Sequence, residues 1–144
     1  MQSIHILLVE DNEGDILLTT DALKEGKIVN KISVVRDGWK AMQFLEKSGE
    51  YTEVESPNLI LLDVNLPKMN GHEVLTAIKS NEKLKHIPVI MLTTSSSEAD
   101  VIKSYKNSAN CFITKPVDVD DFIGVVTSIQ EFWINIVQLP EPIN

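Results

Sequence analysis

The chain has 144 residues, 43% of them apolar and 24% charged, which is the size and composition of one globular domain. A formal net charge of −8 disfavours direct binding to nucleic acid or to an anionic membrane surface. A single cysteine excludes an internal disulfide framework, and the apolar runs are too short for a signal peptide or a membrane span, so we expect a cytoplasmic protein.

Five short apolar runs predict five strands, at residues 4–9, 32–35, 59–62, 89–92 and 111–113. The runs around Leu7, Leu61 and Met91 are continuously apolar, a pattern typical of strands that are covered on both faces of a sheet. Between the second and third runs, residues 48–57 form a long polar connection.

Residues at helical spacing, most of them apolar, lie between and after these runs and predict five helices. In chain order, the patterns are Ile16, Leu17, Thr20, Leu23 and Lys24; Ala41, Phe44 and Leu45; Val74, Leu75 and Ile78; Val101, Ile102 and Tyr105; and Phe122, Val126, Ile129, Trp133 and Ile136. Because strands and helices alternate strictly, we expect right-handed βαβ crossovers and a parallel sheet with helices on both faces. The predicted fold is a doubly wound (βα)5 domain of the α/β class.

Chemically reactive side chains follow the ends of four predicted strands. They are Glu10 and Asp11 after the first strand, Asp63 after the third, Thr93 after the fourth, and Lys115 with Pro116 after the fifth. In an open α/β sheet, ligands bind beyond the carboxyl ends of the strands. The sequence therefore predicts one site at this edge of the sheet, built from residues that are far apart along the chain.

Three of these side chains are carboxylates, which repel one another unless a cation neutralises them. Oxygen ligands without a nearby cysteine or histidine pair favour Mg2+, or Mn2+, over zinc. The hydroxyl of Thr93 and the ammonium of Lys115 would complete a site suited to phosphoryl transfer. Asp63 is the predicted nucleophile, because it follows the most buried of the predicted strands and so has a rigid backbone.

The chain resembles the receiver domains of two-component response regulators in an ordered set of residues: Glu10-Asp11, Asp63, Thr93 and Lys115-Pro116. The resemblance includes the segment LDVNLPKMNG at residues 62–71 and extends over essentially the whole chain. Three further features look like the stand-alone regulators that are paired with phytochrome-type histidine kinases. These are the connection at 48–57, the run MLTTS at 91–95, and Phe132-Trp133 followed by Leu139-Pro140.

This resemblance implies a flavodoxin-like sheet with strand order 2-1-3-4-5 and a phosphorylated switch. Asp63 would accept a phosphoryl group from a kinase histidine, or from acetyl phosphate, and form an acyl phosphate. Asp11, Asp63 and the backbone carbonyl of Asn65 would bind Mg2+, and Glu10 would act through water. The protein would not be an enzyme with a separate substrate, because its chemistry is limited to self-phosphorylation and self-dephosphorylation.

The resemblance also implies how the switch would work. Lys115 would pair with the phosphoryl oxygens, and its peptide bond to Pro116 would be cis. Thr93 would move to hydrogen-bond the phosphoryl group. Phe112 would then swing inward and alter the surface around the fourth helix, the fifth strand and the fifth helix.

We expect the receiver domain to occupy residues 1–136 and a C-terminal arm to occupy residues 137–144, with no effector domain. Output would then pass through protein contacts. Large apolar side chains continue past the length that a five-stranded sheet would cover, at Phe132, Trp133, Ile136 and Leu139. We therefore expect a homodimer that forms through the fifth helix and the arm.

Two other functions share this fold class or this chemistry. A haloacid-dehalogenase-like phosphatase also uses an Asp nucleophile, but that family places an Asp-x-Asp pair on the first strand, whereas Asp63 follows the third and Asn65 carries an amide. A flavodoxin-like FMN binder needs a loop that donates hydroxyl and amide groups to a phosphate, whereas residues 10–15 are acidic. The receiver remains the preferred interpretation.

Overall fold

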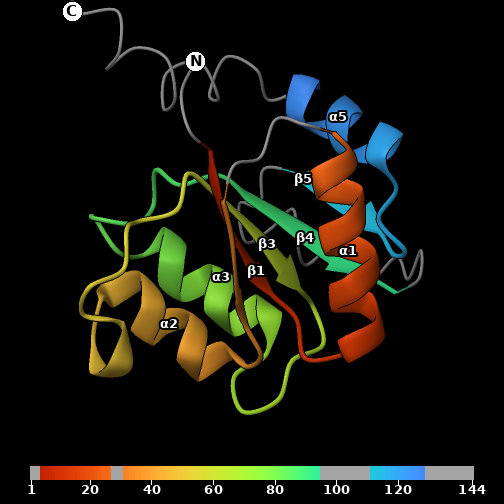
Figure 1. Cartoon of the computed structure of the whole chain (residues 1–144). Helices are drawn as coiled ribbons and strands as arrows, with labels where there is room; N and C mark the ends of the chain where they lie inside the picture. Colours follow the sequence, from red (N-terminus) through yellow and green to blue (C-terminus); the bar gives the residue numbers. More distant parts are fainter. Residues whose placement is uncertain (1–3, 27–30, 95–110, 129–144) are drawn as a thin grey trace, which may run out of the picture.

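Five parallel strands form one sheet in the computed structural model, which describes residues 4–26, 31–94 and 111–128 (Figure 1). The strands are β1 (His5–Val9), β2 (Lys31–Val35), β3 (Leu59–Asp63), β4 (Val89–Thr93) and β5 (Cys111–Thr114). Their spatial order is β2-β1-β3-β4-β5, which confirms the expected order. Each strand end lies within one residue of its predicted position.

Helices cover both faces of the sheet (Figure 1). They are α1 (Glu13–Glu25), α2 (Gly38–Glu46), α3 (Gly71–Lys79) and α5 (Val119–Ser128), with a short 3-10 helix, η1 (Gly49–Tyr51), in the polar connection before β3. Helices α1 and α5 lie together on one face, and α2 and α3 lie together on the other. The doubly wound α/β prediction is thereby confirmed for the described residues.

Two apolar clusters fill the space between the sheet and its two layers of helices. Leu8 and Leu61 belong to the cluster beneath α1 and α5, whereas Leu7 and Ile60 belong to the cluster beneath α2 and α3. All four side chains are fully buried. Successive residues of a strand point to opposite faces, so a sheet covered on both faces needs continuously apolar strands. This is the physical reason for the unbroken apolar runs in the sequence.

The predicted apolar faces of two helices are confirmed. The buried side chains are Ala41, Phe44 and Leu45 in α2, and Val74, Leu75 and Ile78 in α3. These six side chains pack in the cluster on that face of the sheet. In α5, Phe122 is fully buried, as the periodicity predicts.

The predicted face of α1 is wrong in part. Ile16 and Leu23 are buried as expected, but Leu17 is 61% exposed and Lys24 is exposed as well. Thr19 and Ala22 complete the buried face instead. The buried residues lie on one side of Ile16 around the helix axis, with Ala22 about 120° away, whereas Leu17 lies about 100° from Ile16 in the opposite direction and so points away from the sheet. Thr19 faces the sheet because it follows Ile16 by three residues.

Several predictions concern residues outside those that the structure describes. They are the fourth helix with Val101, Ile102 and Tyr105, the last part of the fifth helix, the arm at 137–144, and the dimer residues Phe132, Trp133, Ile136 and Leu139. Among the described residues, no helix is both long enough and apolar enough to cross a membrane.

Two glycines allow the loop between β3 and α3 to pack closely against its surroundings. A Cβ atom at Gly71 would collide with the carbonyl oxygen of Asp63 and with the Cα of Val64. A Cβ atom at Gly38, the first residue of α2, would collide with the backbone of Met69. The amide of Gly71 also donates to the carbonyl of Val64 at 2.9 Å. Close packing at Gly71 and the hydrogen bond from its amide therefore both restrain the backbone that follows Asp63.

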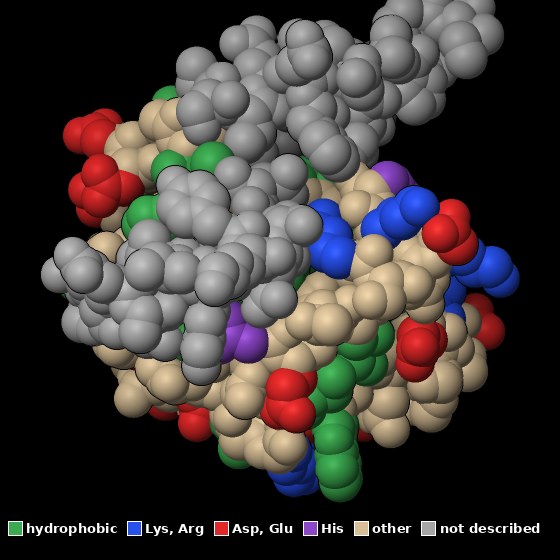
Figure 2. Space-filling model, turned by 180° about the vertical axis from the view of Figure 1, so that it is seen from behind, with side chains coloured by type: hydrophobic (Ala, Val, Ile, Leu, Met, Phe, Trp, Pro, Cys, Tyr) green, Lys and Arg blue, Asp and Glu red, His purple; other side chains and the backbone are tan. Residues whose placement is uncertain are grey.

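Acidic and basic side chains are interspersed on the described part of the face seen from behind (Figure 2). Exposed ion pairs across the molecule include Lys40 with Glu50 at 3.1 Å and Lys85 with Glu82 at 3.0 Å. Pairs of this kind contribute about 0–1 kcal/mol each to stability. On this face, the net charge of −8 does not produce a surface of a single sign.

Candidate functional site

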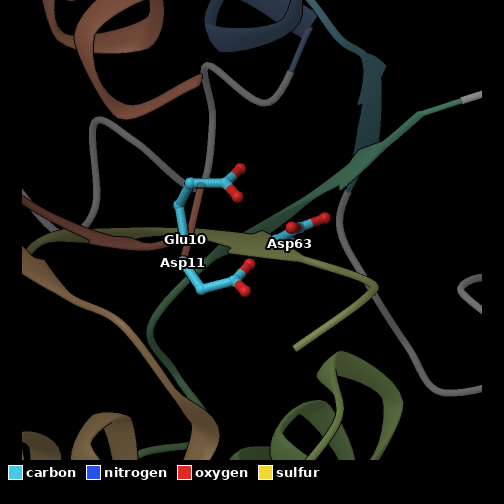
Figure 3. A group of neighbouring side chains, drawn as sticks. All are labelled: Glu10, Asp11 and Asp63. Carbon is cyan, nitrogen blue, oxygen red and sulfur yellow. The ribbon is translucent and has the colours of Figure 1, made fainter. Parts of the chain in front are cut away.

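Three carboxylates meet at the carboxyl end of the sheet (Figure 3). Glu10 and Asp11 directly follow β1, and Asp63 is the last residue of the neighbouring strand β3. Each of the three side chains offers a carboxylate oxygen, and these oxygens lie within 4.8 Å of one another. Glu10 and Asp63 are buried, whereas Asp11 is exposed, so the cluster opens to solvent on one side. The predicted meeting of these side chains is thus observed.

Lys115, which directly follows β5, links the three carboxylates to this end of the β5 strand. Its Nζ donates hydrogen bonds to Glu10 Oε1 at 2.9 Å, to Asp15 Oδ2 at 3.0 Å and to Asp63 Oδ2 at 3.2 Å. The backbone amide of Lys115 donates to the carbonyl of Thr93 at 2.7 Å, which holds the residue beside β4. The peptide bond from Lys115 to Pro116 is cis, as expected.

Glu10 is held in place by burial and by hydrogen bonds from protein donors. Its side chain is fully buried, and besides Lys115 it binds the amide of Asn12, which donates to Glu10 Oε2 at 3.1 Å. The amide of Glu10 itself donates to the carbonyl of Val35 at 3.0 Å. Both carboxylate oxygens of Glu10 therefore have a protein donor in this structure.

Asp63 lies in an environment that disfavours its charge. Only 2% of its surface is exposed. Burial raises the pKa of the Asp63 carboxyl from 3.8 to about 7, and the negative charge of Glu10 adds to the rise. The positive charge of Lys115 acts in the opposite direction without cancelling it. The site thus holds more negative charge than one ammonium neutralises, and a divalent cation is the group that this donor set fits.

Lys115 remains protonated despite its burial. Burial by itself lowers the pKa of this amine, but the hydrogen bonds to Glu10 and Asp15 and the charge of Asp63 outweigh it and raise the pKa above its ordinary value. A side chain that is 6% exposed and still charged is a strong local source of positive potential. Lys115 can therefore stabilise an anionic group that enters the site.

The Thr93 hydroxyl is available for a further hydrogen bond. Its Oγ1 is buried and has no hydrogen-bond partner among the described residues. Buried polar atoms are normally paired, so an unpaired hydroxyl at a strand end marks a place where an additional acceptor or donor can bind. Phe112 on the neighbouring strand β5 is partly buried and packs against the cluster beneath α2 and α3.

The structure adds Asp15 to the residues that the sequence identified. Asp15 lies in the first turn of α1 and accepts a hydrogen bond from Lys115. In the sequence it belongs to an acidic stretch before a helix, where carboxylates commonly favour the helix dipole. The signal that could have revealed it is its place three residues after Asn12, in the first helical turn beside the predicted site. Of the other predicted residues, the Asn65 and Pro116 side chains are exposed.

Comparison with known proteins identifies the family. The model of the response regulator receiver domain matches residues 6–127. The chain belongs to the family of response regulator receiver domains. Receivers of this family are generally signalling switches, and the match confirms the resemblance that the motifs carry.

The individual relatives are response regulators, and one of them is a phytochrome response regulator by name. The chain is 49% identical over 135 residues to response regulator Rcp1 of a Synechocystis species, covering 94% of this chain and 92% of that protein. The structure of the phosphorylated cyanobacterial phytochrome response regulator RcpA is similar with a TM-score of 0.78 and 45% identity, covering 96% and 99% of the two chains. The Mn2+-bound form of Rcp1 is similar with a TM-score of 0.76 and 48% identity, covering 95% and 99%. The narrower resemblance to phytochrome-type regulators is therefore confirmed.

Proposed function

We propose that this protein is a switch whose Asp63 accepts a phosphoryl group from a sensor histidine kinase. The observation that carries the proposal is the pairing of Asp63 with Lys115 at 3.2 Å, next to the carboxylates of Glu10 and Asp11. A carboxylate nucleophile beside a buried ammonium is the arrangement that phosphoryl transfer needs, because catalysis consists mainly of positioning and charge neutralisation. The phosphorylated structure of RcpA supports the same reaction in a relative.

The transfer breaks one bond to phosphorus and forms another. A carboxylate oxygen of Asp63 attacks the phosphorus of a kinase phosphohistidine, the new O–P bond forms, and the P–N bond breaks with its electron pair returning to the imidazole. Lys115 remains close to the phosphoryl oxygens during this step. Later, water attacks the phosphorus, the acyl O–P bond breaks, and the Asp63 carboxylate and inorganic phosphate are released. The chain thus returns to its starting state without turning over a separate substrate.

The acidic cluster would hold Mg2+ or Mn2+. The ligands are proposed to be Asp11, Asp63 and the backbone carbonyl of Asn65, with Glu10 contributing through water. Support comes from the 4.8 Å spacing of the carboxylate oxygens, from the raised pKa of Asp63, and from the Mn2+-bound form of the relative Rcp1. When bound, the cation supplies positive charge that offsets the carboxylates and the phosphoryl oxygens.

Thr93 and Phe112 are proposed to convert phosphorylation into a change of shape. The unpaired Thr93 hydroxyl would donate to a phosphoryl oxygen on Asp63, which gives that buried group the partner it lacks among the described residues. The Phe112 side chain, which is only partly buried, would then move further inward. Because a packed core adopts discrete arrangements, this movement of Phe112 would favour one conformation of the neighbouring surface over another.

The partner is proposed to be a phytochrome-type histidine kinase, because the relative RcpA is a phytochrome response regulator by name. The transfer would take place in the cytoplasm, where ATP is available to charge the kinase. Output is proposed to pass through protein contacts of a receiver spanning residues 1–136. A homodimer would form through the fifth helix and the arm at 137–144, and would use Phe132, Trp133, Ile136 and Leu139.

Intact-mass measurement after incubation with Mg2+ and acetyl phosphate tests the proposal. Wild type should gain the mass of one phosphoryl group, and the Asp63→Asn variant should gain none. Asp21→Asn, which removes an exposed carboxylate from α1, serves as the matched control and should behave like wild type. Rapid turnover of phosphate esters without any adduct would favour the phosphatase alternative and contradict the proposal.

A further inference from the structure

Asp15 is the third acceptor of the Lys115 ammonium, and it lies outside the metal cluster. Its Oδ2 accepts from Lys115 Nζ at 3.0 Å, and its side chain is 30% exposed, against 0% for Glu10 and 3% for Asp63. An ammonium group has three N–H donors, so these three carboxylates use all of them. A phosphoryl oxygen that pairs with Lys115 must therefore displace one carboxylate or share its donor.

The first turn of α1 directs Asp15 toward this contact. Helix α3 begins with Asn70 followed three residues later by Glu73, and their side chains bind each other's backbone amides at 2.9 and 3.0 Å. Helix α1 begins with the same pattern, because Asn12 Oδ1 accepts from the amide of Asp15 at 2.9 Å. The second bond of this pattern, from the amide of the capping residue to the side chain three residues later, is not formed in α1. The amide of Asn12 donates to Glu10 Oε2 instead, and the Asp15 carboxylate binds Lys115.

We propose that Asp15 is a positioning residue that slows phosphoryl loading by sharing the Lys115 ammonium, an inference that rests on the proposed function. Its carboxylate partly neutralises the charge that would otherwise attract the phosphoryl oxygens, and its own charge repels an incoming phosphate dianion. Glu10 and Asp63 retain their bonds to Lys115 when Asp15 is neutral, so the ammonium keeps its place. Removal of this one charge should therefore speed the loading reaction.

The test compares initial rates of phosphate incorporation from acetyl phosphate, with Mg2+ and at low ionic strength, by intact mass. Asp15→Asn keeps an oxygen acceptor for Lys115 and removes the charge, and it should load about two to five times faster than wild type, the factor expected of one partly exposed charge. Asp15→Glu restores the charge and should return the rate to that of wild type. Asp15→Ser, a second neutral variant, should be faster as well.

Glu13→Gln is the matched control, because it removes the same charge from the same turn of α1. Glu13 pairs with Arg36 at 2.7 Å, whereas the carboxylates paired with Lys115 among the described residues are Glu10, Asp15 and Asp63, so this variant should load at the wild-type rate. Circular dichroism shows whether each variant is folded. If only one of Asp15→Asn and Asp15→Ser is folded, the loading rate of that variant is compared with wild type.

Three outcomes would overturn the inference while leaving the proposed function intact, provided that wild type forms an adduct. These are equal or slower loading in the neutral variants, equal acceleration in Glu13→Gln, and acceleration that persists in Asp15→Glu. The lack of any adduct in wild type would instead remove the proposed function itself.

Discussion

At the scale of single residues, the site is dominated by the unfavourable environment of the Asp63 carboxylate. Its pKa is raised from 3.8 to about 7, first by burial and then by the charge of Glu10. Between these two pH values, the folded chain keeps a proton on Asp63 that the unfolded chain has lost. The free energy of unfolding of the metal-free protein therefore falls as the pH rises from about 4 to about 7.

Replacement of Asp63 by Asn should remove this pH dependence. In metal-free buffer, Asp63→Asn should be more stable than wild type at pH 8 by about 2 kcal/mol, because it removes a buried charge that is only partly compensated. At pH 4, where the folded chain keeps the proton on Asp63 and the unfolded chain has lost only part of it, the difference in stability should be small. Urea unfolding followed by circular dichroism measures both differences.

Asp21→Asn, on the exposed side of α1, is the control and should follow wild type at both pH values. If the stability difference between Asp63→Asn and wild type is the same at pH 4 and pH 8, the charge of Asp63 does not destabilise the folded chain as proposed.

At the scale of elements, the loop after β3 depends on the absence of a side chain at Gly71. Gly71→Ala would drive a Cβ atom into the backbone of Asp63 and Val64, neither of which can move without disturbing the end of β3. We expect a loss of about 2 kcal/mol in the free energy of unfolding, measured with urea. Gly124→Ala in α5 is the control, because nothing lies within 4 Å of the added Cβ, and it should be neutral or more stable by up to about 1 kcal/mol. Equal effects of the two substitutions would contradict the close approach at Gly71.

The elements also show what the sequence could and could not predict. Strand positions were predictable because both faces of the sheet are covered, so that β1, β3 and β4 had to be apolar throughout. The face of α1 was predicted only in part, because Leu17 is apolar and exposed while Thr19 is polar and buried. Periodicity assumes that burial follows hydropathy, and this helix departs from that rule at Leu17, Leu18 and Thr19.

The same limit applies to the site. Residues at strand ends could be placed together from the sequence, because the carboxyl ends of parallel strands share one edge. The contact between Asp15 and Lys115 could not, because it depends on which way a helical carboxylate turns after Asn12 has capped the helix. The spacing after Asn12 places Asp15 in the first helical turn near the site, but it does not determine the direction of the Asp15 carboxylate.

At the scale of the whole molecule, the site joins the ends of β1, β3 and the segment after β5, so its carboxylates are brought together only by folding. A cation that binds the folded cluster should therefore stabilise the whole chain. Saturating Mg2+ should raise the midpoint of thermal unfolding by about 5 °C at pH 8, and Asp11→Asn should abolish most of this increase. Glu13→Gln, which removes a nearby exposed carboxylate outside the cluster, should keep it. An unchanged increase in Asp11→Asn would contradict the assignment of Asp11 as a ligand.

The central claim is that Asp63 itself carries the phosphoryl group, and mapping the modified residue tests it most directly. After loading with acetyl phosphate and Mg2+, borohydride reduces an aspartyl phosphate to homoserine, and tandem mass spectrometry of the digested chain locates that change. We predict the change at position 63 and at no other aspartate. Conversion at Asp11, Asp15 or any other aspartate, with position 63 intact, would contradict the account.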